Sequence, residues 1–166
     1  MQLTRSVDTP LGQVLLASRG KALAGLWFWD QRYYAAGLDP DAREGDTEVF
    51  RETEAWLDRY FRGIDPGAPP ELAPRGTPFQ LRVWGELARI PYGKTCSYGE
   101  LANRLSENGC SCSPRAVGAA VGRNPISLLL PCHRVLAADG SLRGYAGGLW
   151  RKAALLDLER GRTMTR

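Results

Sequence analysis

The chain has 166 residues, of which 43% are hydrophobic and 24% charged, a composition that fits a globular protein of one ordinary or two small domains. No apolar stretch is long enough to cross a bilayer, and the N-terminus lacks a signal peptide's apolar run, so we expect a cytoplasmic protein. The four cysteines are then expected as free thiols. With a single histidine and a Cys110-Ser111-Cys112 spacing unlike that of zinc knuckles, we expect neither a metal nor a cofactor.

The net charge of +4 conceals an asymmetry between the two halves of the chain. Residues 1–75 carry 9 basic and 12 acidic side chains, a balance of −3, whereas residues 76–166 carry 13 and 6, a balance of +7. A basic half favours a polyanionic partner such as nucleic acid, because phosphate contacts supply most non-specific affinity. A basic surface that only contacts solvent is the alternative.

The change of charge coincides with the proline-rich segment 64–74, which predicts a linker between a domain at 1–74 and another at 75–166. In the first domain, residues 14–17 and 23–29 have the pattern of strands, and 47–62 that of an amphipathic helix. Trp27 and Trp29 alternate on one strand face, and we expect both in the core. The prediction is a small sheet with a helix packed on it.

The second half is mainly helical. Thr77-Pro78 begins one helix, Ser97-Tyr98-Gly99-Glu100 is a capping box for a second, Ser113-Pro114 begins a third, and the last spans about 149–160. Two short capped helices in succession predict a helix-turn-helix unit within an α+β fold. The third helix carries Ala116, Gly118 and Ala119 after Arg115, and this slim face fits either a neighbouring helix or a nucleic-acid groove.

Pro131-Cys132-His133-Arg134-Val135 is the segment with the clearest chemistry, because it places a thiol beside the only histidine. A cysteine is a strong nucleophile only as the thiolate, and imidazole is suited to take its proton near pH 7. In an extended segment the two side chains would point to opposite sides, so we expect a bridging water between them. Glu159, in the last turn of the final helix, would complete a relay that lowers the thiol pKa. An inert buried cysteine is the alternative.

A turn at Ala138-Asp139-Gly140-Ser141 predicts a hairpin, and the loop Gly144-Tyr145-Ala146-Gly147-Gly148 has an aromatic residue and backbone donors that could surround a flat ligand.

Four motifs in order across residues 77–161 resemble the O6-alkylguanine-DNA alkyltransferases, also called methylated-DNA–protein-cysteine methyltransferases. They are Arg115-Ala116-Val117-Gly118, Gly122-Arg123-Asn124-Pro125-Ile126, Pro131-Cys132-His133-Arg134-Val135 and Gly144-Tyr145-Ala146-Gly147-Gly148-Leu149. The resemblance implies a ribonuclease H-like N-terminal domain. It also implies a protein, monomeric in solution, that repairs alkylated guanine in double-stranded DNA in a single, irreversible transfer.

The resemblance further implies the role of each matching residue. Cys132 would accept the alkyl group, His133 and Glu159 would activate it through water, and Asn124 would order the active-site segment. Arg115 would replace the flipped nucleotide, Tyr98 would crowd the adjacent phosphate, and Ala116, Gly118 and Ala119 would line the minor groove. The substrate contacts would come from Tyr145, the Ala146 amide, the carbonyls of Cys132 and Val135, and a pocket wall at Ser127.

The chain departs from the family's pattern at three points. Ser127 stands where some members have proline, the segment from Glu107 to Cys112 is a longer link, and a single histidine excludes the zinc site of some relatives. Three other functions stay open: a lesion-binding module without repair, a Cys–His hydrolase and a transcriptional regulator. Cys132 argues against the first and would have no role in the third, whereas a hydrolase would not need Arg115 or Tyr98.

Overall fold

The structure, a computed structural model, describes residues 1–164, which form two compact units. The first comprises Met1–Arg75 with Pro125–Ser127, and the second Gly76–Asn124 with the chain from Leu128 onward. The division after Arg75 lies one residue beyond the predicted boundary. The short segment Pro125–Ser127 belongs with the first unit, although the sequence assigned it to the second. None of the helices within residues 1–164 has the length and apolarity needed to cross a membrane.

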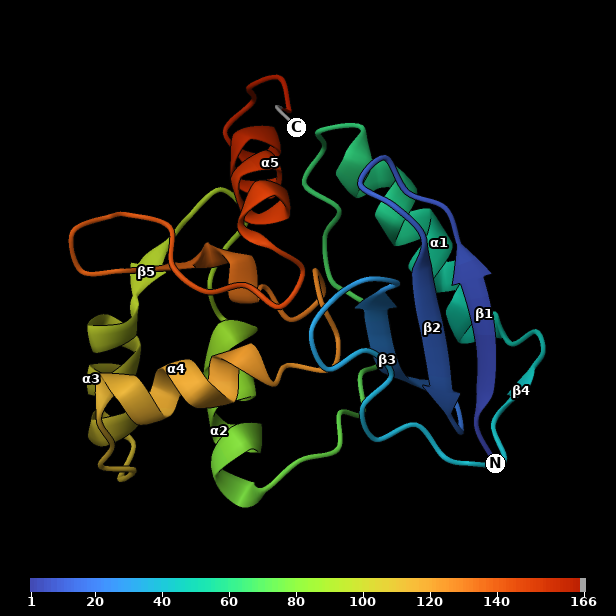
Figure 1. Cartoon of the computed structure of the whole chain (residues 1–166), viewed down its shortest axis with the longest axis horizontal. Helices are drawn as coiled ribbons and strands as arrows, with labels where there is room; N and C mark the ends of the chain where they lie inside the picture. The colour runs from blue at the N-terminus through green and yellow to red at the C-terminus, as the bar shows by residue number, and fades with distance from the viewer. Residues whose placement is uncertain (165–166) are drawn as a thin grey trace. The chain divides into compact units, whose positions relative to one another are not determined.

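The first unit is built on a four-stranded sheet in the order β3-β2-β1-β4 (Figure 1). β1 (Leu3–Val7), β2 (Val14–Arg19) and β3 (Ala22–Phe28) are successive antiparallel strands, and β4 (Arg43–Glu44) pairs parallel to β1. The two strands predicted at 14–17 and 23–29 are therefore confirmed as β2 and β3. Helix α1 (Glu48–Phe61) covers one face of the sheet with Phe50, Trp56 and Tyr60 in its buried stripe.

Strand β3 is buried along its whole length because segments from elsewhere in the first unit complete its outer edge. Leu23 exchanges backbone hydrogen bonds with Glu71 and Ala73, and Leu26 does so with Pro125 and Ser127. Trp27 lies in the core, as expected. Trp29 does not, and 61% of it is exposed, because β3 ends at Phe28 and Trp29 lies in the turn that follows. The Gln31 amide closes this turn by donating to the Phe28 carbonyl at 3.1 Å, and the Gln31 side chain accepts the Phe28 N–H at 2.8 Å.

The second unit contains the predicted helices. α2 (Pro78–Leu87) and α3 (Tyr98–Glu107) begin with complete capping boxes at Thr77 and Ser97. Ser113 caps α4 (Pro114–Gly122), and α5 (Leu149–Glu159) follows a long loop. Helices α2, α3 and α4 pack on one another, and the Trp84 indole donates to the Ala120 carbonyl across this contact at 2.9 Å. The architecture is thus the mixed α+β fold that the sequence predicts.

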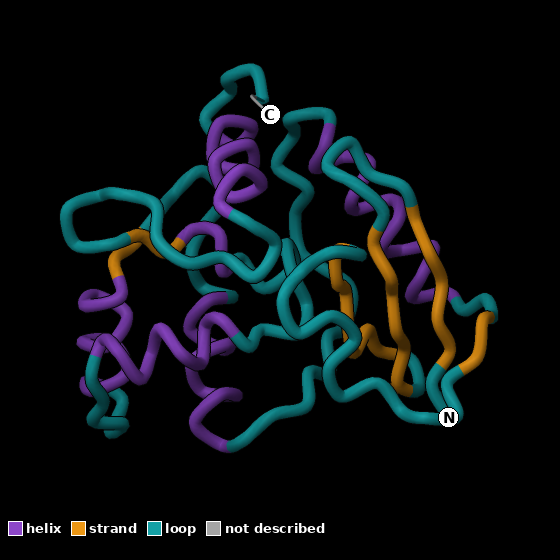
Figure 2. Tube along the Cα trace, in the orientation of Figure 1, coloured by secondary structure: helices purple, strands orange, loops and turns teal. Residues whose placement is uncertain are grey.

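Between α4 and α5 the chain is mostly irregular, and Figure 2 shows the segment after the short strand β6 (Val135–Leu136) as loop. The predicted turn at 138–141 is present, closed by the bond from the Ala137 amide to the Ser141 carbonyl. It does not form a hairpin. β6 instead pairs parallel to β5 (Cys96–Ser97), a strand from the start of α3, so the partner comes from a distant part of the sequence.

Candidate active site

Cys132 begins a single 3-10 turn, η1 (Cys132–Arg134), that follows the buried run Leu128–Leu130. The extended backbone expected here is therefore wrong, because the Arg134 amide bonds back to the Pro131 carbonyl at 3.0 Å and closes the turn. Leu128 adopts a left-handed backbone with φ of 72°, a conformation that side chains of its shape rarely adopt and that concentrates at functional sites. The thiol is only 5% exposed.

The Asn124 side chain holds the segment that leads to the thiol. Its Nδ2 donates to the Leu130 carbonyl at 2.7 Å in a buried hydrogen bond. Burial raises the pKa of Cys132, while the hydrogen bond from Asn124 and the charge of Lys152 act in the opposite direction. The expectation of a lowered thiol pKa is therefore wrong for the protein without substrate. Because this thiol is protonated at neutral pH, it needs a base to become a nucleophile.

His133 is fully buried and lies against Glu159, with Nε2 2.5 Å from the Oε2 of that carboxylate. The structure thus brings together the two residues that the sequence proposed as partners. Burial lowers the pKa of His133, although Glu159 partly opposes this effect. The imidazole is therefore neutral at pH 7. Since the carboxylate requires a donor from Nε2, the basic nitrogen of the ring is Nδ1.

Glu159 accepts three further hydrogen bonds that the sequence did not predict. Arg134 donates from Nε at 2.7 Å and from Nη2 at 3.1 Å, and the Gly93 amide donates at 3.1 Å. Arg134 also donates to the Ile90 carbonyl at 2.7 Å, so the guanidinium is held on two sides. Burial alone would raise the pKa of Glu159, but the bonds from His133 and Arg134 hold it well below its usual range. The Glu159 carboxylate is therefore ionised at neutral pH.

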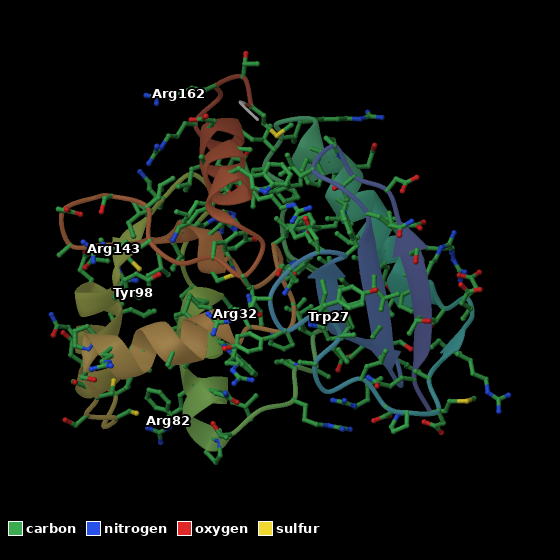
Figure 3. The ribbon with its side chains drawn as sticks, viewed as in Figure 1. Trp27, Arg32, Arg82, Tyr98, Arg143 and Arg162 are labelled. Atoms are coloured by element: carbon green, nitrogen blue, oxygen red, sulfur yellow. The ribbon has the colours of Figure 1, made fainter. Side chains whose placement is uncertain are left out.

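Residues 143–148 form the loop that the sequence predicts to contact substrate, which we call the substrate loop for that prediction; its Tyr145 and Ala146 are both half-buried. Val135, another predicted substrate contact, is fully buried in β6 opposite Cys96. Tyr98, at the start of α3, donates from its hydroxyl to the Arg143 carbonyl at 3.0 Å, and Figure 3 labels both residues beside each other. The side chain predicted to face a phosphate therefore also contacts the substrate loop.

The residues predicted to contact DNA lie on α4. Arg115 in its first turn is exposed, and so are Ala116 and Ala119. Gly118 is half-buried, and a Cβ atom added there would lie 3.7 Å from the Tyr98 ring. An alanine would fit at that distance. The small residues at 116 and 119 are therefore not explained by tight internal packing, which was the alternative reading of this slim face.

Ser127 lies in the first unit, where its hydroxyl donates to Oε1 of Gln31 at 3.3 Å and its amide to the Leu26 carbonyl. Its assignment to the pocket wall stays a prediction. The sequence analysis did not predict that Arg134 bonds to Glu159 or that Lys152 bonds to the Arg143 carbonyl. The role of Lys152 could have been suspected from the sequence, because the first turn of α5 has two cations and no acidic residue. Helix N-termini usually favour acidic residues there.

A buried thiol beside a histidine–glutamate pair defines a protein that uses a cysteine nucleophile. The family model of the 6-O-methylguanine DNA methyltransferase DNA-binding domain matches residues 78–161. A methylated-DNA–protein-cysteine methyltransferase of Mycobacterium leprae is 44% identical over 161 residues, covering 97% of this chain and 94% of the relative. One from Methanosarcina acetivorans is 42% identical over 152 residues, covering 92% and 94%.

Solved structures show the same similarity. The Mycobacterium tuberculosis OGT crystallised in complex with DNA has a TM-score of 0.84 at 42% identity, covering 96% of this chain and 94% of that one. The O6-methylguanine-DNA methyltransferase of Pyrococcus kodakaraensis has a TM-score of 0.61 at 27% identity, covering 96% and 99%. The chain belongs to the methylated-DNA–protein-cysteine methyltransferase family.

Proposed function

We propose that this protein repairs O6-alkylguanine in double-stranded DNA by moving the alkyl group irreversibly to Cys132. The observation that carries the proposal is the buried cluster of Cys132, His133, Glu159 and Arg134, in a member of this family. Its arrangement supplies a shielded thiol together with a neutral base that is held by an ionised carboxylate. A thiol of raised pKa reacts poorly with passing electrophiles, which suits a nucleophile used once.

Activation proceeds when the substrate reaches the thiol. The Cys132 proton passes through a bridging water to Nδ1 of His133, and Glu159 stabilises the imidazolium through Nε2. Asn124 and Lys152 then favour the thiolate that forms, since both act to lower the pKa of Cys132. Because Arg134 already pairs with Glu159, the carboxylate stays ionised throughout, and the added proton remains on the histidine.

The transfer is an in-line displacement. The thiolate attacks the alkyl carbon, the new C–S bond forms as the C–O6 bond breaks, and guanine leaves as an anion. The proton held by His133 returns through water to guanine, so the thiol proton replaces the alkyl group on the base. The thioether has no leaving group that water could displace, so each molecule acts once. Tyr145, the Ala146 amide and the carbonyls of Cys132 and Val135 hold the base.

For recognition, we propose that α3 and α4 act as a helix-turn-helix whose slim face enters the minor groove. Arg115 would occupy the gap left by the flipped nucleotide, and this insertion would offset part of the unstacking cost of a few kcal/mol. The basic balance of the second half supports non-specific phosphate contacts. The first unit would be a ribonuclease H-like structural domain, and the protein would bind as a monomer.

The direct test is incubation with a duplex that contains one O6-methylguanine, followed by intact and peptide mass measurement. The proposal predicts one methyl group on the peptide that carries Cys132. Cys132→Ser should bind the same duplex and acquire no methyl group. Cys96→Ser is the matched control, because it removes another buried thiol of the second unit and should leave transfer intact. Binding without any gain in mass would instead indicate a lesion-binding module.

A further inference from the structure

The first turn of α5 carries two buried cations in an electrostatically unfavourable place. Arg151 is 2% exposed and Lys152 fully buried, although the N-terminus of a helix already carries a partial positive charge. Burying an ammonium or guanidinium group is strongly unfavourable unless hydrogen bonds compensate for the lost hydration. Burial indeed lowers the pKa of Lys152 to about 8, against the opposing effect of Cys132. Both side chains donate hydrogen bonds to carbonyls of the substrate loop.

Lys152 holds the beginning of the substrate loop. Its Nζ donates to two successive carbonyls, that of Arg143 at 2.8 Å and that of Gly144 at 3.2 Å. The Tyr98 hydroxyl donates to the same Arg143 carbonyl at 3.0 Å, and the ammonium lies 5.9 Å from the centre of the Tyr98 ring. One lysine and one tyrosine thus hold the backbone at the point where the loop begins.

Arg151 holds the other end of the loop. Its Nη1 donates to the Gly147 carbonyl at 2.9 Å, and its guanidinium lies 4.4 Å from the centre of the Trp150 ring. The Trp150 indole in turn lies against Gly148, where a side chain would come within 3.1 Å of it. The two cations therefore contact opposite ends of one loop, separated only by Tyr145 and Ala146.

We propose that Arg151 and Lys152 are positioning residues that fix both ends of the substrate loop, so that Tyr145 and Ala146 are already placed for guanine. This inference rests on the proposed function of the loop. Gly144 and Gly148 have φ of 52° and 94°, and the loop has no regular secondary structure. Ordering an irregular backbone costs conformational entropy, which would otherwise reduce the affinity for the base.

The test must separate a loop effect from an effect on the thiol, since the charge of Lys152 also lowers the pKa of Cys132. Two rates are measured at one pH: methyl transfer from an O6-methylguanine duplex, and alkylation of Cys132 by iodoacetamide. Both depend on the fraction of thiolate, so their ratio cancels that fraction. The variants are Arg151→Met, Lys152→Met and the conservative Lys152→Arg, with Arg160→Met as an exposed control directly after the same helix.

The proposal predicts that the ratio falls about tenfold or more in Arg151→Met and Lys152→Met, because each loses a charged hydrogen bond to the loop. The ratio should recover substantially in Lys152→Arg and stay unchanged in Arg160→Met. Amide hydrogen exchange of the peptide covering 143–150 should be faster in both methionine variants. Thermal melting identifies any variant that fails to fold, and the uncharged Arg151→Gln or Lys152→Gln then replaces that methionine variant, with a fall in the same ratio expected.

An unchanged ratio in folded Arg151→Met and Lys152→Met would overturn the proposal. A loss confined to Lys152→Met, with iodoacetamide alkylation reduced in parallel, would also overturn it, because the lysine would then act on the thiol alone. Failure of the proposed function itself is distinguishable, since the unaltered protein would then transfer no methyl group while still reacting with iodoacetamide.

Discussion

Glu159→Gln is the substitution that most directly tests the buried cluster, because glutamine keeps the size of the side chain and removes its charge. The carboxylate accepts four hydrogen bonds, from His133, twice from Arg134 and from the Gly93 amide. The glutamine amide has one oxygen that can accept hydrogen bonds, whereas its NH2 group can only donate them. At least one donor therefore loses its acceptor, and the Arg134 guanidinium stays buried without a countercharge.

The expected loss of stability follows from that unpaired cation. Removing one partner of a buried ion pair costs about 3–5 kcal/mol, which in a protein of this length lowers the Tm by about 10 °C. The double variant Glu159→Gln/Arg134→Met removes both charges and should lose less stability than the two single variants together. Methyl transfer should slow by about 10²-fold, since His133 loses the group that raises its pKa.

The assay is thermal and urea unfolding at pH 7, with Glu107→Gln as the control because that carboxylate is exposed at the end of α3. A Glu159→Gln protein that melts within about 2 °C of the unaltered protein would refute the reasoning. The pH dependence gives a second check. A carboxyl group whose pKa is lower in the folded state than its ordinary value of 4.5 stabilises the folded protein at pH values above 4.5. The difference in unfolding free energy between the unaltered protein and Glu159→Gln should therefore shrink as the pH falls below 4.5.

Three further predictions concern the DNA-binding and thiol-positioning residues. Arg115→Ala should slow transfer from duplex DNA far more than transfer from free O6-alkylguanine, and equal losses measured on the two substrates would contradict a role in base flipping. Asn124→Ala should cost about 1–3 kcal/mol in urea unfolding, from the lost bond to Leu130, and raise the pKa of Cys132. Unchanged iodoacetamide reactivity of Cys132 at pH 7 would count against that prediction. Affinity for undamaged DNA should fall with added salt without sequence preference in a filter-binding assay, whereas a strongly preferred sequence would favour a regulator.

The elements that the sequence predicted well are those set by local signals. Thr77 and Ser97 each begin a helix because the side chain three residues later completes a capping box, and both ends of that interaction are visible in the sequence. The pairing of His133 with Glu159 was also predictable, because a carboxylate in the last turn of α5 is unfavourable without a partner.

The error at Trp29 arose from a local turn, and the other errors arose where contacts between distant residues decide the structure. The apolar alternation continues through Trp29, one residue past the end of β3, where the amide and the side chain of Gln31 both bond to Phe28 and the chain turns. The turn after β6 has good hairpin residues, but β5 supplies the neighbouring strand. Burial of Cys132, which raises its pKa, depends on packing that no local pattern gives.

In the proposed reaction each Cys132 is consumed by one transfer. The most direct measurement supplies O6-methylguanine duplex in excess and counts, over time, both the guanine restored and the methyl groups bound to protein. We expect both to reach one per protein molecule and then stop, with every methyl group on Cys132. Continued release of guanine beyond one equivalent, or a methyl group on any other residue, would contradict it.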